Sequence, residues 1–298
     1  MNRLVTDSYS PATLISYRKT WKAFQVFREH LNLPYSFPIV PEHLALFLAF
    51  RAEKHPSASA ARSVLSALSW FHKINNVKDP TKNFTLSRMI LGLQRKRQDT
   101  WRVKPMGKSL LIKVLKMFPF VLPSAYSRTL MKSLFLLAYY GCMRIGELTF
   151  SGTLDHTLLV RNVKVIQSPA GIKIQLTLAS FKHSKAPASF LLLPLENDSS
   201  CPVNALLDFL KVRPPIEGPL FIDHSGHPIT RHAVALSLKK CVEHCGFPAN
   251  EYNTHSLRVG RATDLALAGT PDHVIRKTGR WSSNAYLNYI RFDVFQLL

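Results

Sequence analysis

The apolar periodicity of this chain breaks at residues 99–107, and the break divides it into two parts of different character. Before it, apolar residues recur at helical spacing only, whereas after it helical stretches alternate with short apolar runs that are typical of strands. Pro105 and Gly107 interrupt regular structure, so we place an interdomain linker here. A chain of 298 residues, 46% of them hydrophobic, is long enough for two domains with separate cores.

The first part, residues 1–100, is predicted to be a small all-α domain. Ser10 and Pro11 have the residue types of a helix N-cap and a first helical position. The helix that follows has an apolar face and a basic face, the latter with Arg18, Lys19, Lys22 and Arg28. Further helices are expected over 41–54 and 58–74, and from about residue 86 to a basic run, Arg95, Lys96 and Arg97.

The second part, residues 107–298, mixes helices with strands. Its expected helices lie near 108–118, 126–140, 202–212, 231–245, 255–268, 271–278 and 282–292, and its expected strands near 157–166, 171–180 and 189–195. We interpret the three strands as a small antiparallel sheet. The predicted fold class is therefore mainly α with a small antiparallel β-sheet (α+β).

The charge balance of the chain is far from neutral, because 39 Lys and Arg stand against 18 Asp and Glu, a net charge of +21. Divided after Val103, the first part carries +10 and the second +11 (16 basic and 6 acidic residues, then 23 and 12). Such an excess predicts a nucleic acid partner, and its even distribution suits a protein that grips a duplex from two sides. The alternative is a ribosome-associated or merely basic protein.

The four cysteines, at 142, 201, 241 and 245, are too few and too unevenly spaced for a disulfide framework. The N-terminus lacks an apolar signal segment and no apolar run could cross a bilayer, so we expect an intracellular protein with no membrane partner. Cys241, His244 and Cys245 could offer metal ligands from one helical face, but no matching pair with zinc-site spacing follows. Buried cysteines and a surface histidine explain the same residues, and we expect no metal.

Three short segments of the second part combine arginine, histidine, tryptophan and tyrosine. Residues 141–148, Gly-Cys-Met-Arg-Ile-Gly-Glu-Leu, follow a strongly apolar stretch, where an arginine is costly unless it is paired. His255 and Arg258 come just after the N-cap types Asn253 and Thr254, so we expect them on one face of a helix. The third segment contains Gly279, Arg280 and Trp281, followed by Tyr286 and Tyr289 on a predicted helix.

These segments, Arg-Ile-Gly-Glu-Leu, His-Ser-Leu-Arg, Gly-Arg-Trp and Asn-Tyr-Ile-Arg, resemble in that order the conserved boxes of the tyrosine recombinases (phage integrase and Cre-like family). The forms Gly-Arg-Trp-Ser-Ser and Tyr-Leu-Asn-Tyr-Ile-Arg are most similar to recombinases of eukaryotic DIRS-type and Crypton-type mobile elements. Each box alone is weak evidence for the family, but four boxes in the family's order behind a basic helical domain make a specific signal. The resemblance implies a core-binding domain over 1–100 and a catalytic domain over 107–298, which close on DNA as a C-shaped clamp.

The resemblance also assigns catalytic roles. Tyr289 is the nucleophile, and it leaves a 3′-phosphotyrosyl intermediate that stores bond energy, so religation needs no ATP and no other cofactor. Arg144 and Arg258 bind the two nonbridging oxygens, which suits the planar guanidinium fork. His255 and Trp281 donate to the same oxygens, Trp281 standing where many relatives have a second histidine.

Two assignments have competitors. Tyr286 lies one turn from Tyr289, which has the better separation from the tryptophan and the matching Asn-Tyr-Ile-Arg context. The family's lysine that protonates the leaving oxygen corresponds to Lys185, within residues 181–187, although a register slip would replace it with Lys182. Glu147 is expected to have a supporting role, since it can orient the first arginine.

Basic residues on several predicted helices are candidates for DNA contact, with an ordinary solvated face as the alternative. Thr230 has the residue type of an N-cap for the helix that similar proteins bring to the major groove. The candidate DNA-binding residues are Arg18, Lys22, Arg95, Lys96, Arg97, Arg231 and Lys239. Tyr139 and Tyr140 are expected in the core.

The function that the resemblance implies is site-specific recombination or integration of DNA for a mobile element, in the nucleus if the source is eukaryotic. Two protomers bind each site, and a homotetrameric synapse exchanges strands through a Holliday junction. The alternatives are a domesticated DNA-binding protein that no longer cuts and a type IB topoisomerase-like enzyme that nicks and closes DNA.

The end of the sequence bears on assembly. Relatives commonly carry a C-terminal segment that docks onto a neighbouring protomer, whereas nine residues follow Tyr289 here, so we expect a trimmed chain or a different assembly. The tail is apolar enough to pack within its own protomer or against another, through Phe292, Val294, Phe295, Leu297 and Leu298.

Overall fold

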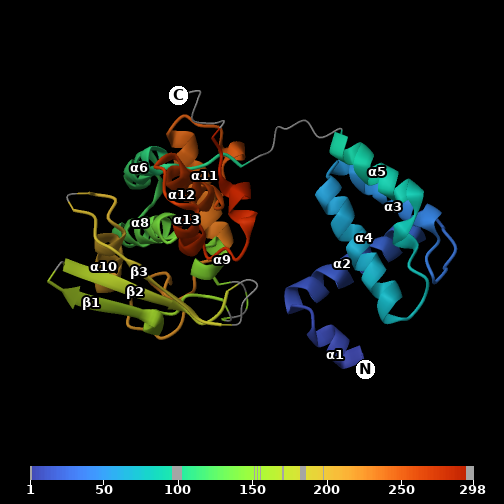
Figure 1. Ribbon diagram of the computed structural model, residues 1–298, viewed down its shortest axis with the longest axis horizontal. Coiled ribbons are helices and arrows are strands. Elements are labelled where there is room, and N and C mark those ends of the chain that lie inside the picture. Colours follow the sequence, from blue (N-terminus) through green and yellow to red (C-terminus); the bar gives the residue numbers. More distant parts are fainter. Residues whose placement is uncertain are drawn as a thin grey trace. The chain divides into compact units, whose positions relative to one another are not determined.

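The computed structural model describes residues 2–95, 103–150, 152, 154, 156–169, 171–181, 186–196 and 198–292, with residues 2 and 3 described by their backbone alone. The chain forms two compact units, Met1–Thr100 and Trp101–Leu298 (Figure 1). Among the described residues, no helix combines the length and the apolar character needed to span a membrane.

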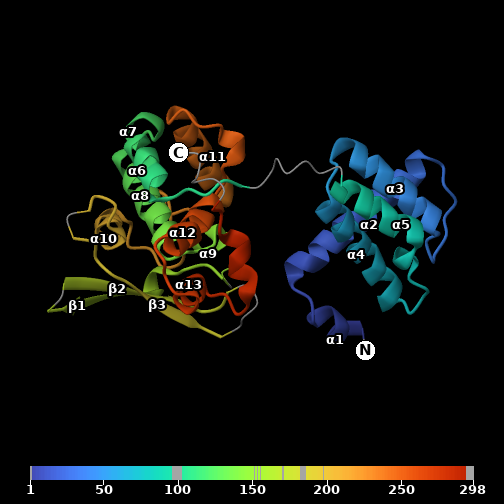
Figure 2. The ribbon, with the colours of Figure 1, turned by 45° about the horizontal axis from the view of Figure 1, so that its top comes forward.

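All the regular elements described in the first unit are helices. Its elements are α1 (Asn2–Asp7), α2 (Pro11–His30), α3 (Pro41–Lys54), α4 (Ala58–Ile74), the 3₁₀ helix η1 (Pro80–Lys82) and α5 (Phe84–Arg95) (Figure 2). The predicted bounds of α3 and α4 are confirmed. The predictions missed α1 and began α5 two residues too late.

Helix α2 begins where the sequence predicts, because the Ser10 hydroxyl accepts a hydrogen bond from the Thr13 amide (3.2 Å) and Pro11 follows at the first helical position. Its apolar face packs against α3, and the rings of Phe24 and Phe47 lie 5.3 Å apart. Packing of this kind stabilises the unit through the apolar surface that it removes from water.

Arg28 does not belong to the basic face of α2, which corrects the sequence prediction. Its side chain is 2% exposed and donates hydrogen bonds to the carbonyls of Pro34 (2.5 Å) and Ser36 (3.4 Å). The guanidinium also lies 4.5 Å from the centre of the Tyr35 ring. Arg28 therefore fixes the loop after α2, since a buried cation needs such partners, and it is not available to bind DNA.

The second unit contains helices and a sheet. Its helices are α6 (Lys108–Lys116), α7 (Phe118–Val121), α8 (Ala125–Tyr140), α9 (Ile145–Leu148), α10 (Pro202–Val212), α11 (Arg231–His244), α12 (Ser256–Leu267) and α13 (Asp272–Gly279), with 3₁₀ helices η2 (Val160–Asn162), η3 (Ala249–Glu251) and η4 (Asn284–Tyr289). Every residue of α8 from Leu134 to Tyr139 is buried, and α10 and α12 pack against this helix. A helix that is apolar all round belongs at the centre of a core, which explains the position of α8.

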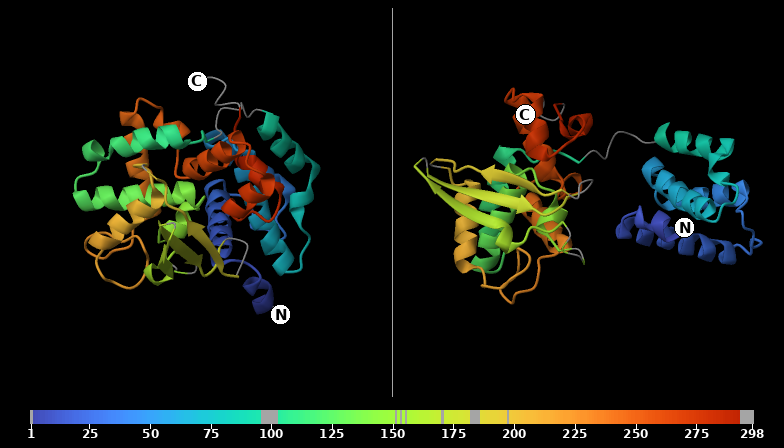
Figure 3. Two further views of the ribbon diagram at one scale, coloured as in Figure 1. Left: turned by 60° about the vertical axis from the view of Figure 1, so that its left-hand side comes forward. Right: turned by 60° about the horizontal axis from the view of Figure 1, so that its bottom comes forward.

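The sheet has three antiparallel strands in the order β1 (Val163–Ser168), β2 (Gly171–Leu178) and β3 (Ala188–Leu192), and α10 packs against β2 (Figure 3). The antiparallel sheet and the mainly helical fold class are thus confirmed. The first strand begins at Val163 and not near residue 157, because Leu159 forms an isolated bridge with Pro219 and η2 follows it. On β2, the alternate residues Ile174, Leu176 and Leu178 are buried in the core.

Residues 103–107, the end of the predicted linker, are in fact part of the second unit. The amide of Lys104 donates to the Glu251 carbonyl, and that of Met106 donates to the Ser256 carbonyl, both at 2.9 Å. Met106 is fully buried, and Gly260 of α12 lies against it so closely that a Cβ would be 1.9 Å from the Met106 carbonyl oxygen. This segment therefore packs against the start of α12, the helix that carries Arg258 and directly follows His255.

We expect Gly260→Ala to lower the free energy of unfolding by roughly 1–3 kcal/mol or more, because the added methyl group clashes with backbone that has no room to move. Urea unfolding followed by circular dichroism measures the change. The matched control is Gly92→Ala, since no atom lies within 4 Å of a Cβ built there in α5, and a gain of roughly 0.5–1 kcal/mol is expected. Wild-type stability of Gly260→Ala would contradict the close packing.

Candidate active site

Arg258 lies at the centre of the candidate site. It belongs to the first turn of α12 and is fully buried, with hydrogen bonds from Nη1 to the Cys142 carbonyl (2.5 Å) and from Nη2 to the Gly279 carbonyl (2.6 Å). No carboxylate forms an ion pair with it in the part of the chain that the structure describes. Its Nε has no hydrogen-bond partner among the described residues. A buried cation that no carboxylate neutralises is suited to bind an anion.

Arg144 directly follows the turn after α8 and is the N-cap of α9. Its amide donates to Glu147 Oε2 (2.9 Å) and its Nη1 to Glu147 Oε1 (3.1 Å), so the carboxylate holds both the backbone and the side chain of the arginine. Its side chain is 23% exposed while that of Glu147 is 3% exposed. The geometry supports the expectation that Glu147 orients Arg144, and leaves part of the guanidinium open to solvent.

His255 immediately precedes α12 and is its N-cap, so the helix begins later than the predicted caps Asn253 and Thr254 imply. Asn253 has a capping role nevertheless, because its side-chain oxygen accepts the His255 amide (2.7 Å). Burial and the positive charges of Arg258, Arg144, Arg231 and Arg291 lower the pKa of His255 to about 4. The imidazole is therefore neutral at pH 7 and can both donate and accept a hydrogen bond.

Tyr289 ends η4 and brings its ring to the same place. The ring centre lies 5.0 Å from that of His255, 4.8 Å from that of Trp281 and 5.3 Å from the guanidinium carbon of Arg258. The Trp281 Nε1 is buried and has no hydrogen-bond partner among the described residues. A buried donor without a partner is costly, and a phosphoryl oxygen would satisfy it.

Tyr286, the competitor of Tyr289, has other partners. It is 2% exposed, and the Arg276 guanidinium lies 5.2 Å from the centre of its ring. A hydrogen bond with Asp272 raises the pKa of its phenol, which makes the nucleophilic phenolate harder to form. This arrangement favours Tyr289 as the nucleophile.

The candidate lysines Lys182 and Lys185 lie outside the described residues, as do Lys96 and Arg97 of the basic run and residues 293–298 of the apolar tail. In sequence, both lysines fall between the end of β2 at Leu178 and the start of β3 at Ala188. Phe292, the described residue of the tail, is 49% exposed.

The other candidate DNA contacts are exposed. Arg18 and Lys22 lie on α2, Arg95 ends α5, and Lys239 lies on α11. Arg231 is the first residue of α11, where the Thr230 hydroxyl accepts the Ala233 amide (3.2 Å) and forms the predicted cap. Because the charge of Arg231 acts on His255, it lies close to the candidate site, whereas the other four are surface cations of their units.

Sequence reasoning missed several supporting contacts. Cys142 adopts a left-handed backbone (φ 45°) and its carbonyl holds Arg258, although only its place between the apolar helix and the first arginine hinted at this role. The Tyr139 hydroxyl donates to Asp264 of α12, which also accepts the Lys108 amide at the start of α6 (2.8 Å). Tyr139 is thus in the core, as predicted, but it also ties α8 to α12.

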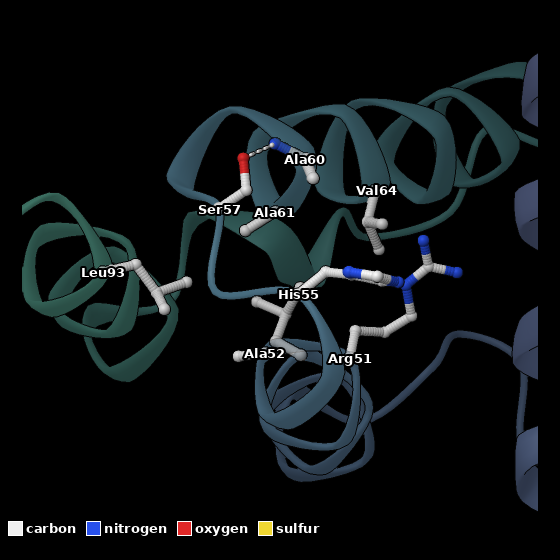
Figure 4. A pocket seen from close by; sticks show the side chains of 9 residues that line it. Arg51, Ala52, His55, Ser57, Ala60, Ala61, Val64 and Leu93 are labelled. Carbon is white, nitrogen blue, oxygen red and sulfur yellow. Dashed lines mark hydrogen bonds between the residues drawn. The ribbon is translucent and has the colours of Figure 1, made fainter. Parts of the chain in front are cut away.

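Outside this site, a small pocket lies in the first unit between α3, α4 and α5 (Figure 4). The Ser57 hydroxyl at its edge accepts the Ala60 amide (3.3 Å) and caps α4. The pocket is lined by Leu48, Arg51, Ala52, His55, Ser57, Ala60, Ala61, Val64 and Leu93. None of these is a candidate site residue.

The depressed pKa of His255 predicts a pH dependence. The pKa of His255 is about 4 in the folded protein and 6.5 ordinarily, so as the pH falls the unfolded chain binds a proton at His255 before the folded chain does. The free energy of unfolding that this histidine contributes above pH 6.5 is therefore lost as the pH falls towards 4. The loss should reach on the order of 2–3 kcal/mol at most. Urea unfolding at several pH values should show it in the wild type and not in His255→Gln.

A direct check is NMR titration of the His255 imidazole, with a midpoint expected near 4. The exposed His227, paired with Asp223 at 3.4 Å, is a histidine outside this site and serves as the internal comparison. A His255 midpoint near 6.5 would show that burial and the surrounding arginines do not lower its pKa as inferred.

Solved structures of known proteins share the fold of this chain. The chain is similar to the XerH site-specific recombinase bound to palindromic difH substrate (19% identity, TM-score 0.65, covering 91% of this chain and 74% of that one). It is also similar to the Tn1549 transposon integrase in complex with transposon right end DNA (16%, 0.62, 97% and 91%) and to a lambda integrase dimer bound to a COC′ core site (15%, 0.60, 97% and 76%).

These likenesses show the fold, and the family follows from the sequence itself. No protein with a curated description matches the chain. Residues 121–291, more than half of the chain, match the profile of the phage integrase family, and this segment contains every candidate catalytic residue. The chain therefore belongs to the phage integrase family, the tyrosine recombinases.

Proposed function

We propose that this chain is a site-specific recombinase or integrase that cleaves and rejoins DNA through a 3′-phosphotyrosyl intermediate on Tyr289. The observation that carries the proposal is the convergence of one tyrosine ring on His255, Trp281 and the buried Arg258. These side chains come from two stretches of the sequence, residues 255–258 and 281–289. Together they offer a nucleophile beside donors suited to a phosphate.

The proposed reaction uses each group once. The Tyr289 oxygen attacks phosphorus while Arg144 and Arg258 bind the nonbridging oxygens, where negative charge grows in the transition state. The neutral imidazole of His255 can accept the phenolic proton or donate to a phosphoryl oxygen, and Trp281 Nε1 donates to the same phosphate. Lys185 protonates the 5′ oxygen as its bond to phosphorus breaks, and attack by a 5′-hydroxyl reverses the sequence.

The two units are proposed to share the binding of double-stranded DNA, the first as a core-binding domain and the second as the catalytic domain. The exposed cations Arg18, Lys22 and Arg95 of the first unit are suited to backbone phosphates, as are Arg231 and Lys239 of the second. Two protomers at each site and four in the synapse would exchange strands in pairs. The lambda integrase to which the chain is similar is a dimer on a core site.

We further propose that the enzyme comes from a eukaryotic mobile element of the DIRS or Crypton type and acts in the nucleus. The support is the form of two motifs, Gly-Arg-Trp-Ser-Ser at 279–283 and Tyr-Leu-Asn-Tyr-Ile-Arg at 286–291. The identities of 15–19% to the XerH, Tn1549 and lambda proteins are low enough to accommodate a separate lineage.

A nicked suicide duplex of the cognate sequence tests the nucleophile, because the short cleaved strand diffuses away and traps the covalent complex. We expect the wild type and Tyr286→Phe to become covalently attached to DNA, and Tyr289→Phe to lose attachment by at least about 1,000-fold, since no other group replaces the phenol. Denaturing gel electrophoresis of labelled DNA measures the complex. Equal trapping by wild type and Tyr289→Phe would refute the proposal.

The same substrate separates the alternatives. A domesticated DNA-binding protein would bind the duplex without attachment. A topoisomerase-like enzyme would attach and also relax supercoiled plasmid as a monomer, without recombinant products from paired sites.

The lysine assignment is tested with a duplex in which sulfur replaces the bridging 5′ oxygen at the cleaved phosphate. A thiolate leaves without being protonated, so Lys185→Ala should cleave the ordinary duplex on the order of 100-fold slower than wild type and recover on the sulfur duplex. Lys182→Ala is the matched control and should resemble wild type on both. Recovery of Lys182→Ala in place of Lys185→Ala would exchange the two roles.

A further inference from the structure

Arg280 occupies an unusual backbone conformation between two residues of the candidate site. It is the C-cap of α13, with φ 56° and ψ 44°, the left-handed region that glycine adopts most easily. The carbonyl of the preceding Gly279 holds Arg258, and the ring of the following Trp281 lies against Tyr289. An arginine in this conformation is strained relative to glycine, so contacts of its side chain must stabilise this backbone conformation.

The side chain of Arg280 is 8% exposed and is bound on several sides. Its Nη2 donates to Glu147 Oε2 (2.7 Å), its Nη1 donates to the Gly141 carbonyl (3.2 Å), and its guanidinium carbon lies 5.1 Å from the centre of the Phe190 ring on β3. Arg280 thus joins the turn before Trp281 to the turn before Arg144. These are the two turns whose carbonyls hold Arg258.

Glu147 is shared between two arginines. Oε1 accepts the Arg144 side chain, whereas Oε2 accepts both the Arg144 amide and Arg280 Nη2. The negative charge of the buried carboxylate is therefore divided between two guanidinium groups. Without Arg280, that charge would act on Arg144 alone and would compete more strongly with a phosphate for its donors.

We propose that Arg280 is a positioning residue for strand cleavage: it holds Glu147 and the turn at Gly279–Trp281 so that Arg144, Arg258 and Trp281 meet one phosphate. This inference rests on the proposed function. Arg280 reaches no DNA in this role, because its guanidinium is occupied within the protein, so its loss should slow the chemical step and leave DNA affinity unchanged.

The test compares Arg280→Gly, Arg280→Ala and Arg280→Lys in the full-length protein. Single-turnover attachment to the nicked duplex measures the chemical step, DNA titration measures affinity, and urea unfolding measures stability. We expect Arg280→Gly and Arg280→Ala to cleave on the order of 10- to 100-fold slower at saturating DNA, with affinity within about twofold of wild type. Arg280→Lys should recover part of the rate, since it keeps the charge but loses the planar fork.

The two small variants separate positioning from folding. Glycine relieves the left-handed backbone and alanine does not, so Arg280→Gly should unfold at a higher urea concentration than Arg280→Ala while cleaving equally slowly. If Arg280 served stability alone, the slower enzyme would also be the less stable one. Cleavage rates that follow the stabilities would therefore overturn the proposal.

Two further variants complete the experiment. Glu147→Gln combined with Arg280→Gly should slow cleavage less than the product of the two single effects, because both changes break one interaction. Arg213→Gln is the matched control. Arg213 is also buried, but its four hydrogen bonds go to carbonyls of residues 214–220, outside the site. The Arg213→Gln variant should therefore cleave within about twofold of the wild-type rate at temperatures where it is folded. If wild type attaches to DNA and Arg280→Gly attaches equally fast, the inference fails alone; if wild type does not attach, the proposed function fails.

Discussion

The burial of Arg258 between two backbone carbonyls is the interaction on which the rest of the site depends. A guanidinium removed from water needs partners, and here the carbonyls of Cys142 and Gly279 supply them from segments far apart in the sequence. The left-handed Cys142, the end of α13 and the buried start of α12 must all be in place for those two bonds to form. The fold therefore fixes the Arg258 guanidinium in place, and the aromatic rings of Trp281 and Tyr289 pack against it.

Concentrated positive charge has consequences for the neighbours of Arg258. His255 keeps a neutral imidazole, because burial disfavours its charged form and because the nearby arginines would repel a further positive charge. The carboxylate of Glu147 offsets part of the charge at the edge of the site, where it also sets the backbone of Arg144. Among the described residues of the second unit, Glu147 neutralises only part of this positive charge, so the site remains suited to bind an anion.

Local signals made much of the fold predictable, and long-range contacts account for what was missed. Proline and serine fix the starts of α2, α3 and α4, and those bounds follow from the sequence alone. Motif order gave the catalytic candidates, and the described ones lie together. By contrast, the docking of residues 103–107 on α12 and the burial of Arg28 depend on carbonyls that no local pattern reveals. The left-handed conformation of Arg280 is hidden for the same reason, since its partners lie more than 130 residues away.

The pair Gly279 and Arg280 shows how side-chain demands outweigh backbone preference. Backbone preference alone would place glycine at position 280, where φ is positive, and allow a side chain at 279, the last residue of α13. The chain does the reverse, because a Cβ at Gly279 would lie 1.8 Å from the Trp281 ring, and because position 280 needs a guanidinium to reach Glu147. Gly279 therefore leaves room for the Trp281 ring to approach Arg258 closely. The left-handed backbone of Arg280 is strained, but its side chain joins the two turns whose carbonyls hold the buried Arg258.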